Sequence, residues 1–102
     1  IVLNDRIPDG RDVSWIWDVD FEDFSSQFKN IIISGDRAFD MGLRIKYTQS
    51  IIHDSLFIIQ ENLREAIALS LEKTNKSEIL YILPTYSAML EVRKILTGKK
   101  IL

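Results

Sequence analysis

The sequence has no cysteine and a single histidine, His53. The absence of cysteine excludes disulfide bonds, thiolate metal sites and a cysteine nucleophile. A Cys-His or Ser-His reaction would therefore have to use His53 or take its histidine from another chain. His53 lies in or beside an apolar run, next to Asp54, and no second histidine or acid-rich spacing accompanies it. We interpret it as a packed or edge residue and expect no metal site.

Long apolar runs and an excess of one charge are missing as well. The chain carries 13 Lys and Arg against 15 Asp and Glu, a formal net charge of −2, without any basic run. The sequence therefore lacks the clustered basic residues that bind a phosphate backbone, and we expect no nucleic-acid partner. No apolar run approaches the ~20 residues that a membrane span needs, and no signal segment opens the chain. We expect a cytoplasmic protein without a transmembrane segment.

The length and composition fit one globular domain. The chain has 102 residues, of which 46% are hydrophobic and 27% are charged, close to ordinary globular usage. It opens on Ile1-Val2-Leu3, an apolar run already in strand register and without a start methionine. We interpret residues 1–102 as a single domain of a longer protein.

Four short apolar runs alternate with amphipathic stretches, which is typical of parallel strands joined by crossover helices. The strands are expected at residues 1–3, 31–33, within 51–59, and at 79–83. Because these runs are apolar on both faces, we predict a doubly wound α/β fold, with a mostly parallel sheet of about four strands and helices on both faces. For the third strand, 51–53 and 56–59 both qualify.

Three helices are expected between and after these strands. Apolar residues at helical spacing predict them over 36–47, 61–73 and 85–96, with Gly98 as the stop of the last one. The segment 13–28 is ambiguous: residues 15–21 alternate like a strand, and 22–28 look like a short helix. Core packing and an interface anchor each explain the two tryptophans, Trp15 and Trp17.

Three loops are expected at the carboxyl ends of the strands, where an open parallel sheet gathers its ligands. They comprise residues 4–14, 34–37 and 83–86, and the first of them concentrates charge in Asp5, Arg6, Asp9, Arg11 and Asp12. Taken alone, such a loop is more often an exposed turn whose aspartates accept backbone hydrogen bonds. The second loop offers Asp36 as a helix cap and backbone amides to an anion, and capping alone explains it.

Two other α/β functions fit these loops less well. A receiver domain of the response-regulator type needs an acidic pair, a phosphoacceptor aspartate and a lysine after the last strand. Asp5 and Asp54 can be assigned to two of these roles, but no lysine follows Leu83-Pro84, so the match fails. A generic small-ligand-binding Rossmann-like domain is disfavoured because no Gly-x-Gly-x-x-Gly follows a strand.

The charged loop also carries a family resemblance. Leu3-Asn4-Asp5 and the stretch from Asp9-Gly10-Arg11-Asp12-Val13-Ser14-Trp15 to Glu22 resemble the C-terminal domain of the MurT subunit of lipid II isoglutaminyl synthase. The resemblance continues through residues 34–38, 43–44 and 83–91, so it covers most of the chain. The first motif is long and unusual enough to be specific.

This resemblance implies a function. It implies a Mur-ligase-like chain whose upstream domains bind ATP and Mg, and which amidates the D-glutamate α-carboxylate of lipid II. A separate GatD-like glutamine amidotransferase subunit would supply ammonia with a cysteine and a histidine. Asp12, the aspartate of the Gly-Arg-Asp motif, is expected to complete that Cys-His pair as a catalytic residue. The isolated domain is expected to be inactive.

Further site residues follow from analogy with Mur ligase C-terminal domains, which close over the active site. Asn4, Asp5, Arg11 and Asp36 are expected to face the substrate or the nucleotide. A non-catalytic docking module, in which Asp12 only makes an interface salt bridge, is the alternative. An exposed, unpaired Asp12 favours the catalytic role, whereas burial against Arg11 or Arg37 favours a structural one.

Overall fold

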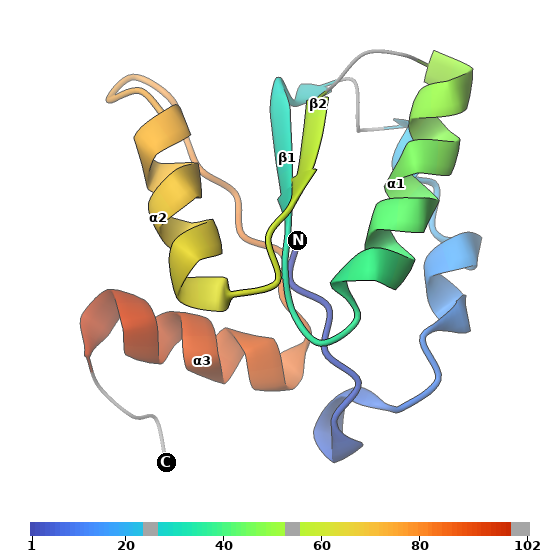
Figure 1. The fold of residues 1–102 in the computed structure, drawn as a ribbon, viewed down its shortest axis with the longest axis horizontal. Coiled ribbons are helices and arrows are strands. Elements are labelled where there is room, and N and C mark those ends of the chain that lie inside the picture. Colours follow the sequence, from blue (N-terminus) through green and yellow to red (C-terminus); the bar gives the residue numbers. More distant parts are fainter. Residues whose placement is uncertain (24–26, 53–55, 99–102) are drawn as a thin grey trace.

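Two parallel strands form the centre of the molecule in the computed structural model, which describes residues 1–23, 27–52 and 56–98. β1 (Asn30–Ile33) pairs with β2 (Leu56–Ile59). α1 (Ala38–Ile52) joins them and covers one face of the pair, while α2 (Leu63–Lys73) and α3 (Tyr86–Thr97) lie on the other side (Figure 1). The predicted α/β class, with a parallel sheet and helices on both faces, is confirmed.

The opening segment extends this sheet by single bridges. Val2 forms parallel bridges with Ser34 on one side and with Pro84 on the other. Its N–H donates to the Leu83 carbonyl, and its own carbonyl accepts from Thr85, both at 3.0 Å. The spatial order is therefore β2, β1, the Val2 segment and the Pro84 segment.

The expected number of regular strands is therefore not reached in the part of the chain that the structure describes. The sheet has two strands, and the predicted strands at 1–3 and 79–83 are represented by isolated bridges. Pro84 has no N–H to donate, which limits the ladder that its segment can form. The third predicted strand is β2 at 56–59, because residues 51–52 continue α1. His53 and Asp54 lie outside the described residues.

Within residues 13–23, the described first part of the ambiguous segment, the chain forms two 3₁₀ helices. They are η2 (Ser14–Asp18) and η3 (Phe21–Asp23), so the strand-like alternation at 15–21 was misleading. Val13, Ile16 and Val19 are three residues apart, which places them on one face of a helix with three residues per turn. The first two are buried, and Val19 packs against the same cluster.

The apolar core is divided between the two faces of the sheet. The larger cluster packs α1 and the 3₁₀ segment against β1 and the opening segment, and it comprises Leu3, Val13, Ile16, Phe21, Ile31, Ile33, Ala38, Met41 and Ile45. The smaller cluster lies on the side of α2 and α3 and comprises Val2, Ile67, Ala88 and Val92. Apolar side chains on both faces are the reason that helices cover both.

Replacing Gly35 by alanine should destabilise the fold. Gly35 follows β1 with φ +104°, and a Cβ there would lie 2.5 Å from the Leu3 carbonyl oxygen and 2.9 Å from Asn4 Oδ1. Left-handed strain and overpacking together should lower the free energy of unfolding by about 3 kcal/mol, measured by denaturant titration. Gly98→Ala is the matched control, because its φ is +72° but nothing lies within 4 Å. It should lose about 1 kcal/mol, and equal losses would refute the close approach.

Candidate functional site at the carboxyl ends of the strands

Asn4 joins the three predicted loops at the carboxyl edge of the sheet. It is only 2% exposed. Its backbone N–H donates to Thr85 Oγ1 and its Nδ2 donates to Ser87 Oγ, both at 3.1 Å, while its Oδ1 accepts the Asp36 N–H at 2.9 Å. The convergence of the loops follows from the parallel strands. A role for Asn4 toward substrate stays a prediction, and its amide is engaged inside the domain.

Two ion-pair groups attach the first loop to the helices. Arg37 Nη1 lies 3.2 Å from Asp5 and its Nε lies 2.7 Å from Asp40. Hydrogen bonds from Arg37 to these two carboxylates, that to Asp40 being the stronger, raise the pKa of the guanidinium above its ordinary value. Asp5, one of the residues predicted to face substrate, is thus half-buried beside a cation.

Arg6 organises the second group. Its Nε lies 3.1 Å from Asp36, and its Nη1 contacts Glu91 on α3. Hydrogen bonds to Asp36 and then to Glu91 raise the pKa of Arg6. Exposed pairs of this kind contribute little stability each, so their role is to set the path of the loop. Asp36, which is also predicted to face substrate, is therefore already paired with an arginine of the same domain.

Asp9 caps the amino end of α3. Its Oδ1 accepts the Ser87 N–H at 2.7 Å, and its Oδ2 accepts from the Ser87 hydroxyl and the Arg6 N–H. Burial acts to raise the pKa of Asp9, but these hydrogen bonds outweigh it and the pKa is lowered. A carboxylate at the positive end of a helix is favourable in its ionised form. Asp9 is therefore accounted for by the fold.

Asp12 lies on the exposed part of the same loop. Its Oδ1 accepts the backbone N–H of Ser14 at 2.9 Å, which fixes the carboxylate at the start of η2. Hydrogen bonds from Ser14 are the main cause of its lowered pKa, and the charge of Arg37 adds to them. Across residues 1–23, 27–52 and 56–98, no ion pair connects Asp12 with Arg11 or Arg37. Asp12 is thus an ionised carboxylate held in place and presented to solvent.

A buried arginine holds the segment that follows Asp12. Arg44, on α1, is 3% exposed. Its Nε donates to the Ile16 carbonyl at 3.0 Å, one Nη donates to the Val19 carbonyl at 2.6 Å, and both Nη atoms bind Glu22 at 2.8 and 2.9 Å. A second Nη1 bond reaches Thr48 Oγ1 at 2.7 Å. The guanidinium therefore replaces the regular backbone pairing that η2 and η3 lack.

Aromatic rings surround this guanidinium. Its Cζ lies 5.1 to 5.9 Å from the ring centroids of Phe21, Trp17 and Tyr47. Trp17 also meets Tyr47 edge to face, with centroids 5.7 Å apart. Trp15 and Trp17 are 44% and 47% exposed, so neither is a core residue. Arg44 is not among the site residues expected from the sequence, although the available signal was a lone arginine among the apolar residues of an amphipathic helix.

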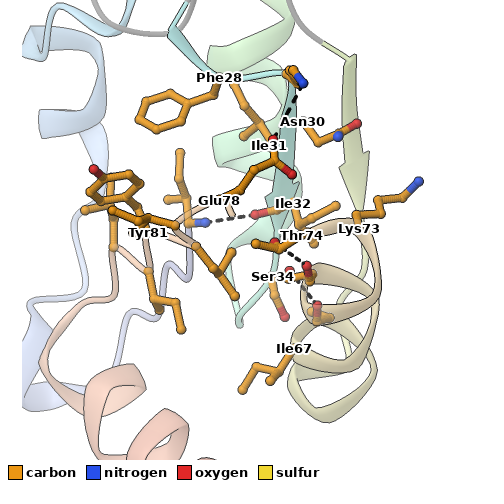
Figure 2. A pocket seen from close by; sticks show the side chains of 18 of the residues that line it. Phe28, Asn30, Ile31, Ile32, Ser34, Ile67, Lys73, Thr74, Glu78 and Tyr81 are labelled. Atoms are coloured by element: carbon orange, nitrogen blue, oxygen red, sulfur yellow. Dashed lines mark hydrogen bonds and ion pairs between the residues drawn. The ribbon is translucent and has the colours of Figure 1, made fainter. Parts of the chain in front are cut away.

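A separate hollow of about 550 Å³ lies between β1, α2 and the segment before Pro84 (Figure 2). Ile32, Ile67 and Tyr81 are among its lining residues, and the Phe28 and Tyr81 rings meet at 5.8 Å. None of the site residues predicted from the sequence lines it. The charged loop cluster and this hollow are therefore distinct features.

Among the described residues, no group of three or more His, Cys, Asp or Glu side chains is arranged to hold a metal ion. No helix in the same part of the chain has the length and apolar character needed to cross a membrane.

The fold and the loop cluster define a small parallel α/β domain that presents one ordered carboxylate at the carboxyl edge of its sheet. The profile of a family described as MurT ligase C-terminal matches residues 1–89. The chain therefore belongs to the MurT ligase C-terminal family, and the resemblance seen in the sequence is confirmed.

Individual relatives agree with this assignment. The chain is 32% identical over 102 residues to the MurT subunit of lipid II isoglutaminyl synthase (glutamine-hydrolyzing) of Streptococcus pneumoniae strain ATCC BAA-255 / R6. It is 50% identical over 50 residues to the proteins of the same name from Staphylococcus aureus strains COL and N315. The first match covers 99% of this chain but 22% of the relative, and the others cover 48% and 11%.

Replacing Arg44 by methionine should destabilise the domain strongly. The change leaves the Glu22 carboxylate and two backbone carbonyls without their buried donor. We expect a loss of about 3–5 kcal/mol in the free energy of unfolding, measured by denaturant titration. Lys46→Met, at an exposed position of the same helix, should change it by less than about 0.5 kcal/mol. A loss at Arg44 as small as that at Lys46 would contradict the role of the guanidinium.

The pairing of Glu22 should also appear in the pH dependence of stability. The hydrogen bonds from Arg44 are the main cause that lowers the pKa of Glu22 from 4.5 to about 2. A lowered pKa in the folded state stabilises the protein above the unfolded pKa, and this contribution is lost as the pH falls toward the folded value. Wild type should therefore exceed Glu22→Gln in unfolding free energy at pH 6–7, and the gap should shrink progressively between pH 4.5 and 2. Glu72→Gln, on α2, is the control for loss of an exposed carboxylate.

Proposed function

We propose that this chain is the C-terminal domain of the ligase subunit of a lipid II isoglutaminyl synthase, and that Asp12 completes the Cys-His pair of a GatD-like glutamine amidotransferase subunit. The MurT ligase C-terminal family supports the first part, and the relatives carry the words subunit and glutamine-hydrolyzing in their names. The observation that carries the second part is Asp12 itself. It is the aspartate of the first loop that is exposed and ordered without an ion pair among the described residues.

The proposed chemistry needs only a carboxylate from this chain. This chain has no cysteine and supplies no thiol nucleophile, but it can orient a histidine on another subunit. Asp12 would accept the imidazole N–H, fix the tautomer and stabilise the imidazolium when it takes the thiol proton. The lowered pKa of Asp12 favours the ionised form that this role requires.

The complete synthase would amidate the D-glutamate α-carboxylate of lipid II in the cytoplasm, with ATP and with ammonia from glutamine. ATP and Mg would bind mainly to parts of the ligase subunit outside this chain. One observation fits that division: Asp5 and Asp36 are already paired with arginines of this domain. Arg11 is exposed on the same loop as Asp12, which suits contact with substrate or nucleotide. The isolated chain would be inactive.

The docking alternative assigns Asp12 a salt bridge with the partner and no part in the chemistry. The exposed carboxylate is compatible with this alternative too, because a rim charge needs only accessibility. The two hypotheses differ in what the charge does to glutamine hydrolysis. Membership of the MurT ligase C-terminal family argues against the hypothesis of a generic small-ligand-binding Rossmann-like domain.

Asp12→Asn in the reconstituted complex tests the catalytic role. Asparagine keeps the shape and the acceptor for the Ser14 N–H, but it removes the charge and should lower the glutaminase rate by on the order of 10²–10⁴-fold. Asp18→Asn, at the last residue of η2, is the matched control for an exposed aspartate and should retain the native rate. A native glutaminase rate in Asp12→Asn would refute the catalytic role.

A further inference from the structure

The outward face of α1 carries exposed apolar side chains that the role of Asp12 does not use. Phe39, Leu43 and Tyr47 are 62%, 60% and 53% exposed, although each is large and apolar. Their four-residue spacing makes them neighbours along one side of the helix. Trp17 continues the row through its ring contact with Tyr47. We call these four residues the α1 stripe.

The α1 stripe is built on a rigid support. Met41 and Ile45, on the opposite side of α1, are each 1% exposed and belong to the larger core. Arg44 lies under the rings of Trp17 and Tyr47 and is hydrogen-bonded to the backbone of the 3₁₀ segment. Preformed aromatic surfaces of this kind are typical of interface anchors, because little side-chain entropy is lost on binding.

The stripe is continuous with the Asp12 loop. Asp12 binds the first residue of η2, and Trp17 lies in that same five-residue helix. Figure 1 shows the segment that contains η2 and η3 beside α1, and both η2 and η3 contact this helix. A protein that brings a histidine to Asp12 must therefore approach the side of the molecule on which the stripe begins.

The charges around this side are mostly acidic. The exposed side chains of Asp12, Asp18, Asp20 and Asp23 lie on the loop and the 3₁₀ segment. The exposed cations there are Arg11 and Arg6 on the loop and Lys46 on α1, and Arg6 is already paired with Asp36 and Glu91. A partner surface with lysine and arginine around an apolar centre would complement this arrangement, since opposite potentials steer association and set its register.

We infer that the α1 stripe is the docking surface for the amidotransferase subunit, which would contact it with an apolar patch rimmed by basic side chains. This inference rests on the proposed function, because it takes the identity of the partner from it. The stripe would supply most of the affinity, and Asp12 would act at one end of the same interface.

Affinity measurements on the complete ligase subunit and its amidotransferase test the inference. Leu43→Glu places a charge at the centre of the stripe, where the side chain is 60% exposed and belongs to neither core cluster. It should raise the dissociation constant, measured by calorimetry, by at least about tenfold, as expected for an interface anchor. Leu71→Glu, at a 53% exposed leucine of α2, is the matched control and should bind like wild type. Equal affinities of the two variants would overturn the inference.

A second measurement needs no variant. Hydroxyl-radical footprinting of the wild-type subunits should show Trp17, Phe39 and Tyr47 protected in the complex but reactive in the ligase subunit alone. Tyr81, which is 60% exposed beside the separate hollow, is the reference and should stay reactive. Protection of the stripe already in the ligase subunit alone would mean that another part of that subunit covers it, which overturns the inference.

The Asp12→Asn complex separates this inference from the proposed function. If Asp12 is catalytic and the stripe supplies the affinity, Asp12→Asn should bind nearly as wild type and lose glutaminase activity. A native glutaminase rate in Asp12→Asn, together with weak binding of Leu43→Glu, would refute the catalytic role alone. Loss of activity in Asp12→Asn together with native binding of Leu43→Glu would refute the docking surface alone.

Discussion

The buried guanidinium of Arg44 is the contact on which the presentation of the site depends. Residues 13–23 have no strand partner and form only short 3₁₀ helices, which are weak by themselves. Arg44 compensates by donating to the carbonyls of Ile16 and Val19 and to Glu22. A buried cation is costly unless its donors are satisfied, and here carboxylate, carbonyl, hydroxyl and ring contacts satisfy them together. Once this segment is fixed on α1, the loop before it is fixed as well, and with it Asp12.

The four aspartates nearest the carboxyl edge illustrate how environment separates identical side chains. Asp5 and Asp36 neutralise arginines, and Asp9 caps α3. These three contribute to the closure of the loop against the helices. Asp12 accepts a hydrogen bond from the adjacent backbone and otherwise faces outward. Asp12 is ordered by the Ser14 N–H but forms no ion pair or helix cap among the described residues, so its carboxylate is available to bind a group on another molecule. The proposed function therefore rests on Asp12 rather than on the loop as a whole.

Much of the fold was predictable because the relevant signals are local. The helices, the parallel arrangement and the left-handed stop at Gly98 follow from hydrophobic periodicity and from glycine stereochemistry. The segment 13–23 was not predictable in this way. Its apolar residues satisfy an alternating pattern and a three-residue pattern at once, and only packing against α1 selects the latter. The first and last predicted strands, at 1–3 and 79–83, are reduced to isolated bridges for a similar reason, since pairing depends on neighbours that a local pattern does not reveal.

The sequence by itself determined that this chain brings no cysteine to any reaction, that it is an α/β domain, and that its charged loop resembles a ligase family, because composition, periodicity and motif are properties of the residues alone. The tertiary structure decided which charges remain available. Asp5, Asp9, Asp12 and Asp36 are identical in the sequence, but Asp5, Asp9 and Asp36 each have a partner 30 to 78 positions away, whereas Asp12 binds the N–H of the nearby Ser14. Ion pairing and capping are set by distances in space, so only the folded chain distinguishes the aspartates that hold the loop from the one that the loop presents.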